Sequence, residues 1–465
     1  MKKNKIVFIR PNYRSHLITP PLGLGYLSSF LRAKGYETQI IDALNLDCSP
    51  QRIAELCEGA DIVAINCLSS YFLETIELSK ILKEQGFTIV IGGAHATALP
   101  ELTLKETHAD YLIVGEGELS LSQLVECIKN NKPVDDIPGV MTDVAKKTIK
   151  SPLIENLDAL PFPDWRQIDP RAYKKAPHGG LVKSFPVAPI ISSRGCPFEC
   201  TFCASPFLSD RKIRFRSPEN VVDEIEYLVN KFDVKEIHFE DDNLTLNRKH
   251  VEGICELLLR RNIKVNWATP NGVRVDTMDL ELLKLMKKSG CYFIAFGVES
   301  GNQDILNRVK KRTSLEMVEK AVKLAKKTGI ITQGFFIFGL PGETEQTIRE
   351  TIKYARKLPL DKAQFLILDV LPGSQLWNEK INSQLTNWSH KSYQEATWVP
   401  EGLTREKLNL SPGYAFRSFF FRPKQILFVL KYFKFSQIPF IIKRAIDFNI
   451  FPFLSPFFKS RSKSS

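Results

Sequence analysis

The sequence predicts an α/β protein with two successive sets of βα units and a basic, aromatic C-terminal region. Short apolar runs rich in strand-forming residues alternate with amphipathic helical patterns over residues 5–130, and again over 187–372. Nearly continuous apolar strands of this kind are typical of parallel sheets covered by helices. The length of 465 residues, with 43% hydrophobic and 25% charged residues, allows two or three domains. It excludes the disordered, collagen-like and disulfide-scaffold classes.

The first set of units predicts a doubly wound, Rossmann-like sheet with five strands, at 6–9, 39–42, 62–67, 89–92 and 111–115. Ligands bind such sheets beyond the carboxyl ends of the strands, so the candidate loops are 11–21, 67–71, 92–97 and 115–118. These loops contain four glycines that would let a ligand approach the backbone closely: Gly92, Gly93, Gly115 and Gly117. The alternative is that they only form tight strand-to-helix turns. The nucleotide fingerprints GxGxxG and GxxxxGK[ST] are absent.

A proline-rich stretch separates the two sets. Residues 131–185 contain seven prolines and little periodicity, which indicates a connector. We therefore expect a first domain at 1–135, a connector at 136–185, a second domain at 186–375 and a C-terminal helical region at 376–465.

The second set predicts six strands, at 188–193, 236–241, 265–272, 292–300, 334–342 and 365–373. Units of about 30 residues in this number form either a partial (βα)6 TIM-type barrel or a second open sheet. In both arrangements the loops that follow the strands are the expected site of chemistry.

The strongest feature of the sequence is a cysteine cluster directly after the first of these strands. Cys196, Cys200 and Cys203 lie in the segment RGCPFECTFC. Three thiolates within eight residues can converge on one soft metal centre, as in iron–sulfur ligation. Zinc would need a fourth protein ligand, and the two available histidines, His178 and His238, lack finger-like spacing. The cluster therefore predicts an iron–sulfur centre with an open coordination position.

The other six cysteines are scattered singly, and the total of nine is odd. This pattern argues against a secreted, disulfide-bonded protein. The apolar run near the N-terminus has only four residues, too few for a signal peptide. No segment reaches the roughly 18 uninterrupted apolar residues of a spanning helix. We expect a cytoplasmic protein in which these six cysteines pack.

The cysteine motif and the strand ends that follow it resemble the radical S-adenosylmethionine (SAM) superfamily. In that family three cysteines hold a [4Fe–4S] cluster, SAM chelates the fourth iron, and reductive cleavage of SAM gives a 5′-deoxyadenosyl radical. The resemblance implies that Phe202 contacts the adenine of SAM and that Gly339 and Gly342 lie behind it. It implies that the methionyl amine is bound by Glu240, Asp241 and Asp242. Ribose and carboxylate contacts are implied for Glu299 and Ser300.

The residue types at these positions support the same placement. Acids clustered at a strand end, as at 240–242, indicate a cation or ammonium partner. The alternative is that residues 240–242 only form a solvated turn and that Glu299 is only a surface acid. For Gly339 and Gly342 the alternative is that they only shape a turn. Five such sites at successive strand ends are rare by chance.

The first domain resembles the cobalamin-binding domain that precedes many radical SAM domains, through the segments PPLGLGYLSSFLRAKGYETQIIDA and IVIGGAHATALPE. The subfamily includes the anaerobic magnesium-protoporphyrin monomethyl ester cyclase and several carbon and phosphorus methylases. The D-x-H-x-x-G motif is absent, so the resemblance implies cobalamin bound base-off without that histidine. We expect His95 to pack or to make a polar contact to cobalamin rather than to ligate metal. His16, in the loop 11–21, is a second histidine that could approach a corrin.

The positive charge of the chain is concentrated at its end. Residues 417–465 contain ten Lys and Arg and one acid, Asp447, while the whole chain has a net charge of +12. The remainder is nearly neutral, so a general nucleic-acid binder is not indicated. The tail predicts a helical cap on the barrel or, as an alternative, peripheral contact with anionic lipid at the inner face of the membrane.

Together these features predict a radical SAM enzyme that uses a [4Fe–4S] cluster, SAM and cobalamin on a small-molecule substrate. Methylation of an unactivated carbon is the expected reaction. Oxidative cyclisation or rearrangement is the next alternative. The electron is expected from an external donor of the flavodoxin or ferredoxin type. One alternative is a methylthiotransferase, which needs three further cysteines in the first domain for a second cluster. Cys48, Cys57 and Cys67 do not have that family's spacing. Another is a non-catalytic cobalamin or redox sensor.

Overall fold

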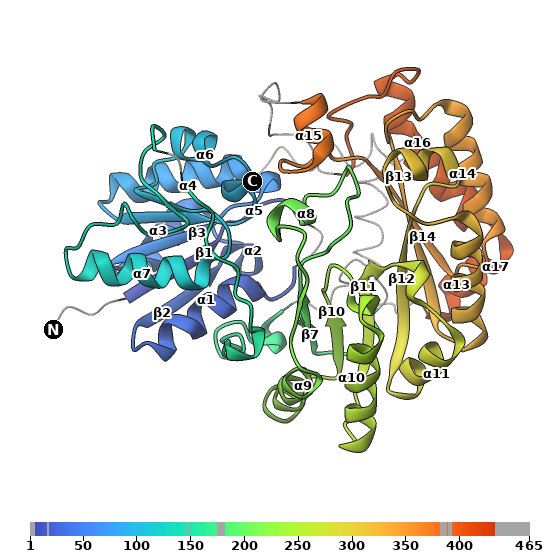
Figure 1. Cartoon of the computed structure of the whole chain (residues 1–465), viewed down its shortest axis with the longest axis horizontal. Coiled ribbons are helices and arrows are strands. Elements are labelled where there is room, and N and C mark those ends of the chain that lie inside the picture. Colours follow the sequence, from blue (N-terminus) through green and yellow to red (C-terminus); the bar gives the residue numbers. More distant parts are fainter. Residues whose placement is uncertain are drawn as a thin grey trace.

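A computed structural model describes residues 5–15, 18–146, 148–173, 182–381, 388 and 393–432. Figure 1 shows two α/β units side by side, the first in blue and the second running from green to orange. His16, His178 and the tail from residue 433 onward lie outside the described residues.

The first unit is a doubly wound sheet, as predicted. Its strand order is β2-β1-β3-β4-β5-β6, and the order reverses between β1 and β3. All pairs are parallel except β5–β6, so the sheet continues past residue 135 with an antiparallel edge strand. The strands are β1 (Lys5–Arg10), β2 (Glu37–Asp42), β3 (Ile62–Asn66), β4 (Thr88–Gly92), β5 (Tyr111–Ile113) and β6 (Val140–Met141).

Helices cover both faces of this sheet because successive strand residues point to opposite sides. In β1, Val7 and Ile9 enter one apolar core, whereas Ile6 and Phe8 enter the other. The helices are α1 (Leu22–Ala33), α2 (Ala43–Leu46), α3 (Pro50–Leu56), α4 (Phe72–Glu84), α5 (Ala94–Ala98), α6 (Pro100–Glu106) and α7 (Gly117–Lys129).

The proline-rich connector packs between the two units. Trp165, 1% exposed, donates its indole N–H to Glu224 Oε1 of the second unit over 2.8 Å. Gln167 Oε1 accepts from the backbone N–H of Ile40 in the first unit, also over 2.8 Å. The low periodicity of this segment therefore reflects irregular structure, in which buried residues such as Trp165 help to join both units.

The second unit is a partial barrel. Its six strands are all parallel and stand in chain order, β14-β13-β12-β11-β10-β7 from one edge to the other. Without a reversal of strand order, the right-handed crossovers place every helix on the outer side, as Figure 1 shows. The strands are β7 (Val187–Ile190), β10 (Glu236–Phe239), β11 (Asn266–Val273), β12 (Cys291–Glu299), β13 (Ile331–Phe338) and β14 (Lys362–Ile367). The main helices are α9 (Pro218–Phe232), α10 (Arg248–Arg260), α11 (Leu280–Lys288), α12 (Gln303–Arg308), α13 (Leu315–Lys327) and α14 (Glu345–Lys357).

The C-terminal region consists of α15 (Gln375–Lys380), α16 (Arg405–Phe420) and α17 (Pro423–Tyr432). Phe419 of α16 is fully buried in the main core. Phe428 and Tyr432 of α17 pack against an apolar cluster that includes Tyr292 and Phe293, at the start of β12. The predicted helical C-terminal region is thus present over these residues, and α17 packs at the amino end of β12. None of the helices within the described ranges has the length and apolarity to cross a membrane.

Candidate functional site

The cysteine motif lies on a loop closed by a two-stranded antiparallel ribbon. Strands β8 (Ser193–Arg194) and β9 (Arg214–Phe215) pair on either side of the loop, and α8 (Ser205–Leu208) lies within it. Gly195, directly before the first cysteine, has a φ of +94°. A Cβ there would lie 2.1 Å from the carbonyl oxygen of Lys212, so the turn requires glycine.

The three thiols of this loop are half-buried and free of disulfides. Burial raises the pKa of all three, that of Cys203 to about 12. The sulfur of Cys203 accepts a hydrogen bond from the backbone N–H of Ser205 over 3.4 Å. Within the part of the chain that the structure describes, no three Cys, His, Asp or Glu side chains are gathered as a metal site. In chemistry, the three thiols of this one loop form a soft donor set that fits an iron–sulfur cluster.

The surroundings of His238, the one candidate zinc ligand among the described histidines named above, do not support a zinc site. His238 is 1% exposed, and its Nε2 lies 2.7 Å from Glu236 Oε1 on the same strand. This hydrogen bond holds the imidazole inside the barrel, so the histidine is engaged away from the thiols.

The acids that follow β10 have different surroundings. Asp241 is 2% exposed and accepts hydrogen bonds from Ser192 and Ser193, the latter over 2.5 Å. Burial outweighs these hydrogen bonds and raises the pKa of Asp241. Asp242 is exposed and accepts a 2.7 Å hydrogen bond from Ser205 in the cysteine loop. The hydrogen bonds of Asp241 therefore connect the end of β10 to the residues that follow β7, whereas Asp242 faces the thiols.

Glu240 is half-buried, and burial raises its pKa. Its neighbour in the same turn, Asn243, is 1% exposed, and its side-chain amide nitrogen has no hydrogen-bond partner in the described structure. Carboxylates beside an unsatisfied amide donor fit a ligand with both ammonium and acceptor groups, such as the methionyl part of SAM.

Glu299 ends β12 in a left-handed backbone conformation, with a φ of +64°. Its Oε1 lies 2.7 Å from the Nζ of Lys311, and both side chains are at most 10% exposed. Burial raises the pKa of Cys200, while the charge of Lys311 opposes that shift, so the ion pair lies within electrostatic reach of the cluster loop. Ser300 Oγ lies 3.1 Å from Thr351 Oγ1. Lys311 was not singled out in the sequence, although an acid at a strand end indicates a cationic partner.

The glycines after β13 shape a turn around a buried acid. Gly339 and Gly342 have positive φ, and a Cβ on Gly342 would lie 2.7 Å from Arg308. Glu343 is fully buried and accepts from the backbone N–H groups of Gly339 and Leu340. Burial raises the pKa of Glu343 to about 8, and its Oε1 has no partner among the described groups. Phe202 packs against the apolar cluster that contains Leu340.

Three of the four glycines predicted to face a ligand in the first unit are packed against protein. A Cβ on Gly93, whose φ is +113°, would lie 2.6 Å from the carbonyl oxygen of Cys67. A Cβ on Gly115 would lie 3.1 Å from the backbone nitrogen of Ser151, and one on Gly117 3.1 Å from the side chain of Leu27. Gly92 has only ordinary contacts. These packing contacts favour the alternative that Gly93, Gly115 and Gly117 form tight turns.

His95, in the helix that follows β4, is 1% exposed. Its ring stacks on Phe72 at 4.1 Å, and its Nδ1 lies 2.9 Å from Ser69 Oγ. Burial lowers the pKa of His95 to about 4, so the imidazole is neutral at physiological pH. Its Nε2 is buried and has no hydrogen-bond partner in the structure as described. A neutral imidazole with an unsatisfied nitrogen at the ligand edge of the sheet fits a polar contact to cobalamin.

Four charged residues join the first unit to the cysteine loop. Arg214 of β9 donates to both carboxylate oxygens of Glu116, over 2.7 and 2.9 Å. Arg194 of β8 lies 2.7 Å from Glu118 and 3.4 Å from Glu116. The motif Gly115-Glu-Gly-Glu118 therefore anchors the ribbon that carries the cysteines, a role that sequence spacing alone could not indicate.

Comparison with known proteins agrees with these observations. Residues 190–355 match the radical SAM superfamily model, and residues 14–125 match the B12 binding domain model. An uncharacterized methyltransferase of Pyrococcus horikoshii is 33% identical, over 96% of this chain and 98% of the relative. The anaerobic magnesium-protoporphyrin IX monomethyl ester cyclase of Rubrivivax gelatinosus is 32% identical, over 87% of this chain and 75% of the relative. The structure of the methyltransferase TsrM from Kitasatospora setae, with cobalamin and a [4Fe–4S] cluster bound, has a TM-score of 0.69 at 19% identity, covering 90% of this chain and 82% of that one.

Proposed function

The chain belongs to the radical SAM superfamily and combines a radical SAM domain with a B12-binding domain, and from this premise we propose that it transfers a methyl group to a small-molecule substrate held between the two domains. When bound, the cluster and SAM supply a 5′-deoxyadenosyl radical by one-electron cleavage of SAM, and cobalamin supplies methyl transfer. The protein's task is to hold these groups in place and to keep water from them.

The observation that carries this proposal is the contact between the two candidate cofactor loops. Helix α5, which contains His95, lies against α8, which begins two residues after Cys203 (Figure 1). The carboxyl edge of the first sheet therefore faces the cysteine loop of the barrel. A substrate held between the domains would lie beside both candidate cofactor loops.

We assign cluster ligation to Cys196, Cys200 and Cys203. We assign Asp242, Glu240 and Asn243 to the methionyl part of SAM. Glu299 is assigned to its ribose or carboxylate, with Lys311 as the ion-pair partner that positions this acid. Phe202, Gly339 and Gly342 are assigned to the adenine side, and His95 and Gly92 to cobalamin. Arg194 and Arg214 hold the ribbon that carries the thiols and so position them.

Oxidative cyclisation is the second candidate reaction, because the cyclase of Rubrivivax gelatinosus is almost as similar to this chain as the methyltransferase of Pyrococcus horikoshii. A methylthiotransferase is not favoured, since Cys57 and Cys67 are fully buried in the core of the first unit. The full burial of these two cysteines agrees with the prediction that they pack. Cys255 and Cys291 are buried as well. Cys48 and Cys127 are half-buried, and Cys48 packs against the same core as Cys57 and Cys67.

Anaerobic reconstitution with iron, sulfide and SAM, with and without hydroxocobalamin, distinguishes these reactions. Methyl transfer predicts S-adenosylhomocysteine whose formation depends on cobalamin. Formation of 5′-deoxyadenosine alone would favour cyclisation. Failure to cleave SAM, with cobalamin still bound, would instead support a sensor.

The enzyme is also proposed to work in the cytoplasm, to receive its electron from an external donor of the flavodoxin or ferredoxin type, and to contact the inner face of the membrane through its C-terminal region. Support for the membrane contact comes from the basic, aromatic composition of residues 417–465.

A further inference from the structure

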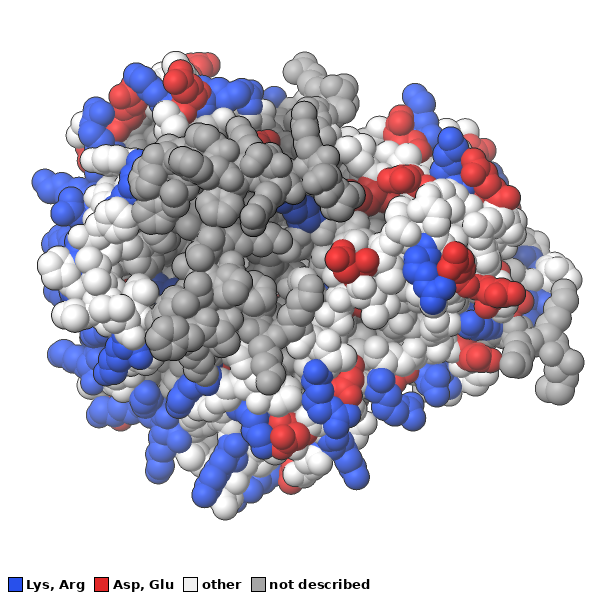
Figure 2. All heavy atoms as spheres, turned by 180° about the vertical axis from the view of Figure 1, so that it is seen from behind, with Lys and Arg blue, Asp and Glu red and all other residues white. Residues whose placement is uncertain are grey.

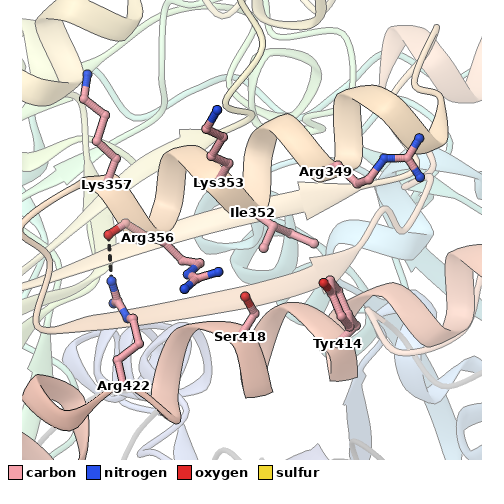
Figure 3. Close-up of a pocket in the computed structure, with 8 residues that line it drawn as sticks. All are labelled: Arg349, Ile352, Lys353, Arg356, Lys357, Tyr414, Ser418 and Arg422. Atoms are coloured by element: carbon pink, nitrogen blue, oxygen red, sulfur yellow. Dashed lines mark hydrogen bonds between the residues drawn. The ribbon is translucent and has the colours of Figure 1, made fainter.

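A groove between α14 and α16 is lined by eight residues, of which five are cationic. It has a volume of about 460 Å³ and lies on the outer side of the barrel. Its cations are Arg349, Lys353, Arg356, Lys357 and Arg422. None of the described residues that line it is an acid, and Tyr414 and Ser418 of α16 supply hydroxyl groups. Figure 3 shows Arg356 and Ile352 pointing from α14 toward α16, and Ser418 and Tyr414 pointing back.

The charges in this groove are only partly neutralised by the protein. Lys357 lies 3.2 Å from Glu319 and Arg349 lies 3.5 Å from Glu345. Lys353 and Arg356 form no ion pair within the described chain. Arg422 donates over 2.6 Å to the carbonyl oxygen of Arg356, which brings two guanidinium side chains to the same groove. Burial and the charge of Arg356 lower the pKa of Arg422.

The alternative reading is that these cations only complement the carboxyl end of α14. A helix end attracts cations in its last turn, and Arg356 and Lys357 lie there. Arg349 and Lys353 lie one to two turns earlier, however, and Arg422 comes from a separate segment. The helix end therefore accounts for only part of the cluster.

An exposed apolar surface adjoins the groove. Helix α17 begins one residue after Arg422 and buries Gln425, which donates to the carbonyl oxygen of Leu360. Its outer side presents Ile426, Leu427 and Leu430, which are 46%, 65% and 68% exposed. Figure 2 shows Lys and Arg side chains gathered along the margin of the barrel unit, at the left of that view. Cations beside exposed leucines are typical of surfaces that bind a lipid interface.

We propose that this groove and the outer side of α17 together bind an anionic phospholipid bilayer, with lipid phosphates in the groove and Leu427 and Leu430 in the headgroup–acyl boundary. The inference deepens the membrane contact proposed above and rests on it. It identifies the surface, which lies within the folded cap rather than in the tail. The chain after residue 432 adds six Lys and Arg and one acid, so the remaining tail has the same sign of charge and is not a match for the groove.

An acidic electron donor is a weaker match for the same surface. The donor has to approach the cysteine loop, which follows the carboxyl end of β7. The groove lies instead at the end of α14, which leads into the start of β14 on the opposite edge of the sheet. Exposed leucines also suit a bilayer better than an acidic protein surface.

Vesicle sedimentation with the full chain tests the proposal. The probe is phosphatidylcholine vesicles with about 30% phosphatidylglycerol, against pure phosphatidylcholine. We expect binding to the anionic vesicles only, weakened at about 0.5 M salt. The variant K353Q/R356Q is expected to lower the partition coefficient about tenfold or more, as is L427S/L430S. The control K105Q/K132Q removes two exposed cations from the first domain and is expected to bind like the unmodified chain.

Three results would overturn the proposal. Unchanged binding by K353Q/R356Q, with a thermal melt like that of the unmodified chain, would assign the contact to the tail alone. Absence of vesicle binding by the unmodified chain would contradict both this surface and the membrane contact. Thermal stabilisation by inorganic phosphate that requires Arg356, without vesicle binding, would make the groove a site for a soluble anion.

Discussion

Arg214 and Glu116 form a bidentate, hydrogen-bonded ion pair across the boundary between the domains. Its two contacts measure 2.7 and 2.9 Å, and the side chains are 6% and 16% exposed. The pair is separated by 98 positions in the sequence. It fixes the ribbon at the base of the cysteine loop to the first domain, so the positions of the two proposed cofactors depend on it.

Breaking this pair is expected to destabilise the protein. In Arg214→Gln a nearly buried carboxylate loses its bidentate partner, which costs about 2–4 kcal/mol of the free energy of unfolding. Urea denaturation measures this loss. The control is Lys146→Gln, which removes the exposed ion pair with Asp135 and is expected to change little. Equal effects of the two substitutions would contradict a structural role for the interdomain pair.

The stability contributed by Glu116 depends on pH. Burial raises the pKa of this carboxyl, but the hydrogen bond from Arg214 and the charge of Arg194 outweigh burial and bring the pKa below its ordinary value of 4.5. A lowered native pKa stabilises the fold above the unfolded value and loses that effect as pH falls through the native value. The difference in unfolding free energy between the unmodified chain and Glu116→Gln is therefore expected to be constant near neutrality and to shrink below about pH 4.5. A difference that grows in acid would be inconsistent with the ion pair.

Two adjacent glycines offer a matched test of the turn after β4. Gly93→Ala places a Cβ against the carbonyl oxygen of Cys67 and forces a positive φ. We expect it to lose about 1–3 kcal/mol or more of stability. In Gly92→Ala the nearest neighbour is 3.5 Å from the new Cβ, so a smaller loss is expected. Comparable losses from the two substitutions would show that the turn does not require glycine at 93.

The two aspartates after β10 are expected to have separate effects. Asp241→Asn turns an amide toward the hydroxyl donors of Ser192 and Ser193, which follow β7, and lowers stability by about 1–3 kcal/mol. Asp242→Asn leaves the melting temperature nearly unchanged and weakens SAM binding about tenfold or more. Calorimetry measures the first effect, and equilibrium binding of SAM to the reconstituted protein the second. Unaltered SAM affinity in Asp242→Asn would remove this residue from the proposed site.

Glu343 predicts a pH effect of the opposite sign. Burial raises its native pKa to about 8, above the ordinary value of 4.5, so the folded chain holds this proton more tightly than the unfolded chain does. Stability from this group is complete below about pH 4.5 and falls as pH rises toward 8. Relative to the unmodified chain, Glu343→Gln is expected to become progressively more stable between these two values. A relative stability that is flat with pH would mean that the acid is ionised in the native protein.

The sequence was sufficient to predict the order of the elements, since apolar strands and amphipathic helices carry local patterns. It also predicted the doubly wound first sheet and the six-stranded partial barrel, and both are confirmed. The cysteine motif lies, as predicted, on the loop after the first barrel strand. The Glu116–Arg214 pair could not be predicted because its members are 98 positions apart. The ribbon of β8 and β9 and the ion pair of Glu299 with Lys311 could not be predicted because nothing in the local pattern marks which residues pair, and their types are common on surfaces. The glycines at 115 and 117 were ambiguous for a related reason: a ligand-facing glycine and a packed glycine look alike until their neighbours are known.

The most direct test of the account is the content of iron and cobalamin after anaerobic reconstitution and gel filtration. The unmodified chain is expected to retain about four irons and about one cobalamin, and Cys196→Ala, Cys200→Ala and Cys203→Ala are each expected to lose the iron while keeping cobalamin. Cys127→Ala, which changes a half-buried cysteine outside the loop, is expected to match the unmodified chain. Less than one iron in the unmodified chain, or iron that survives loss of any one loop cysteine, would contradict the central assignment.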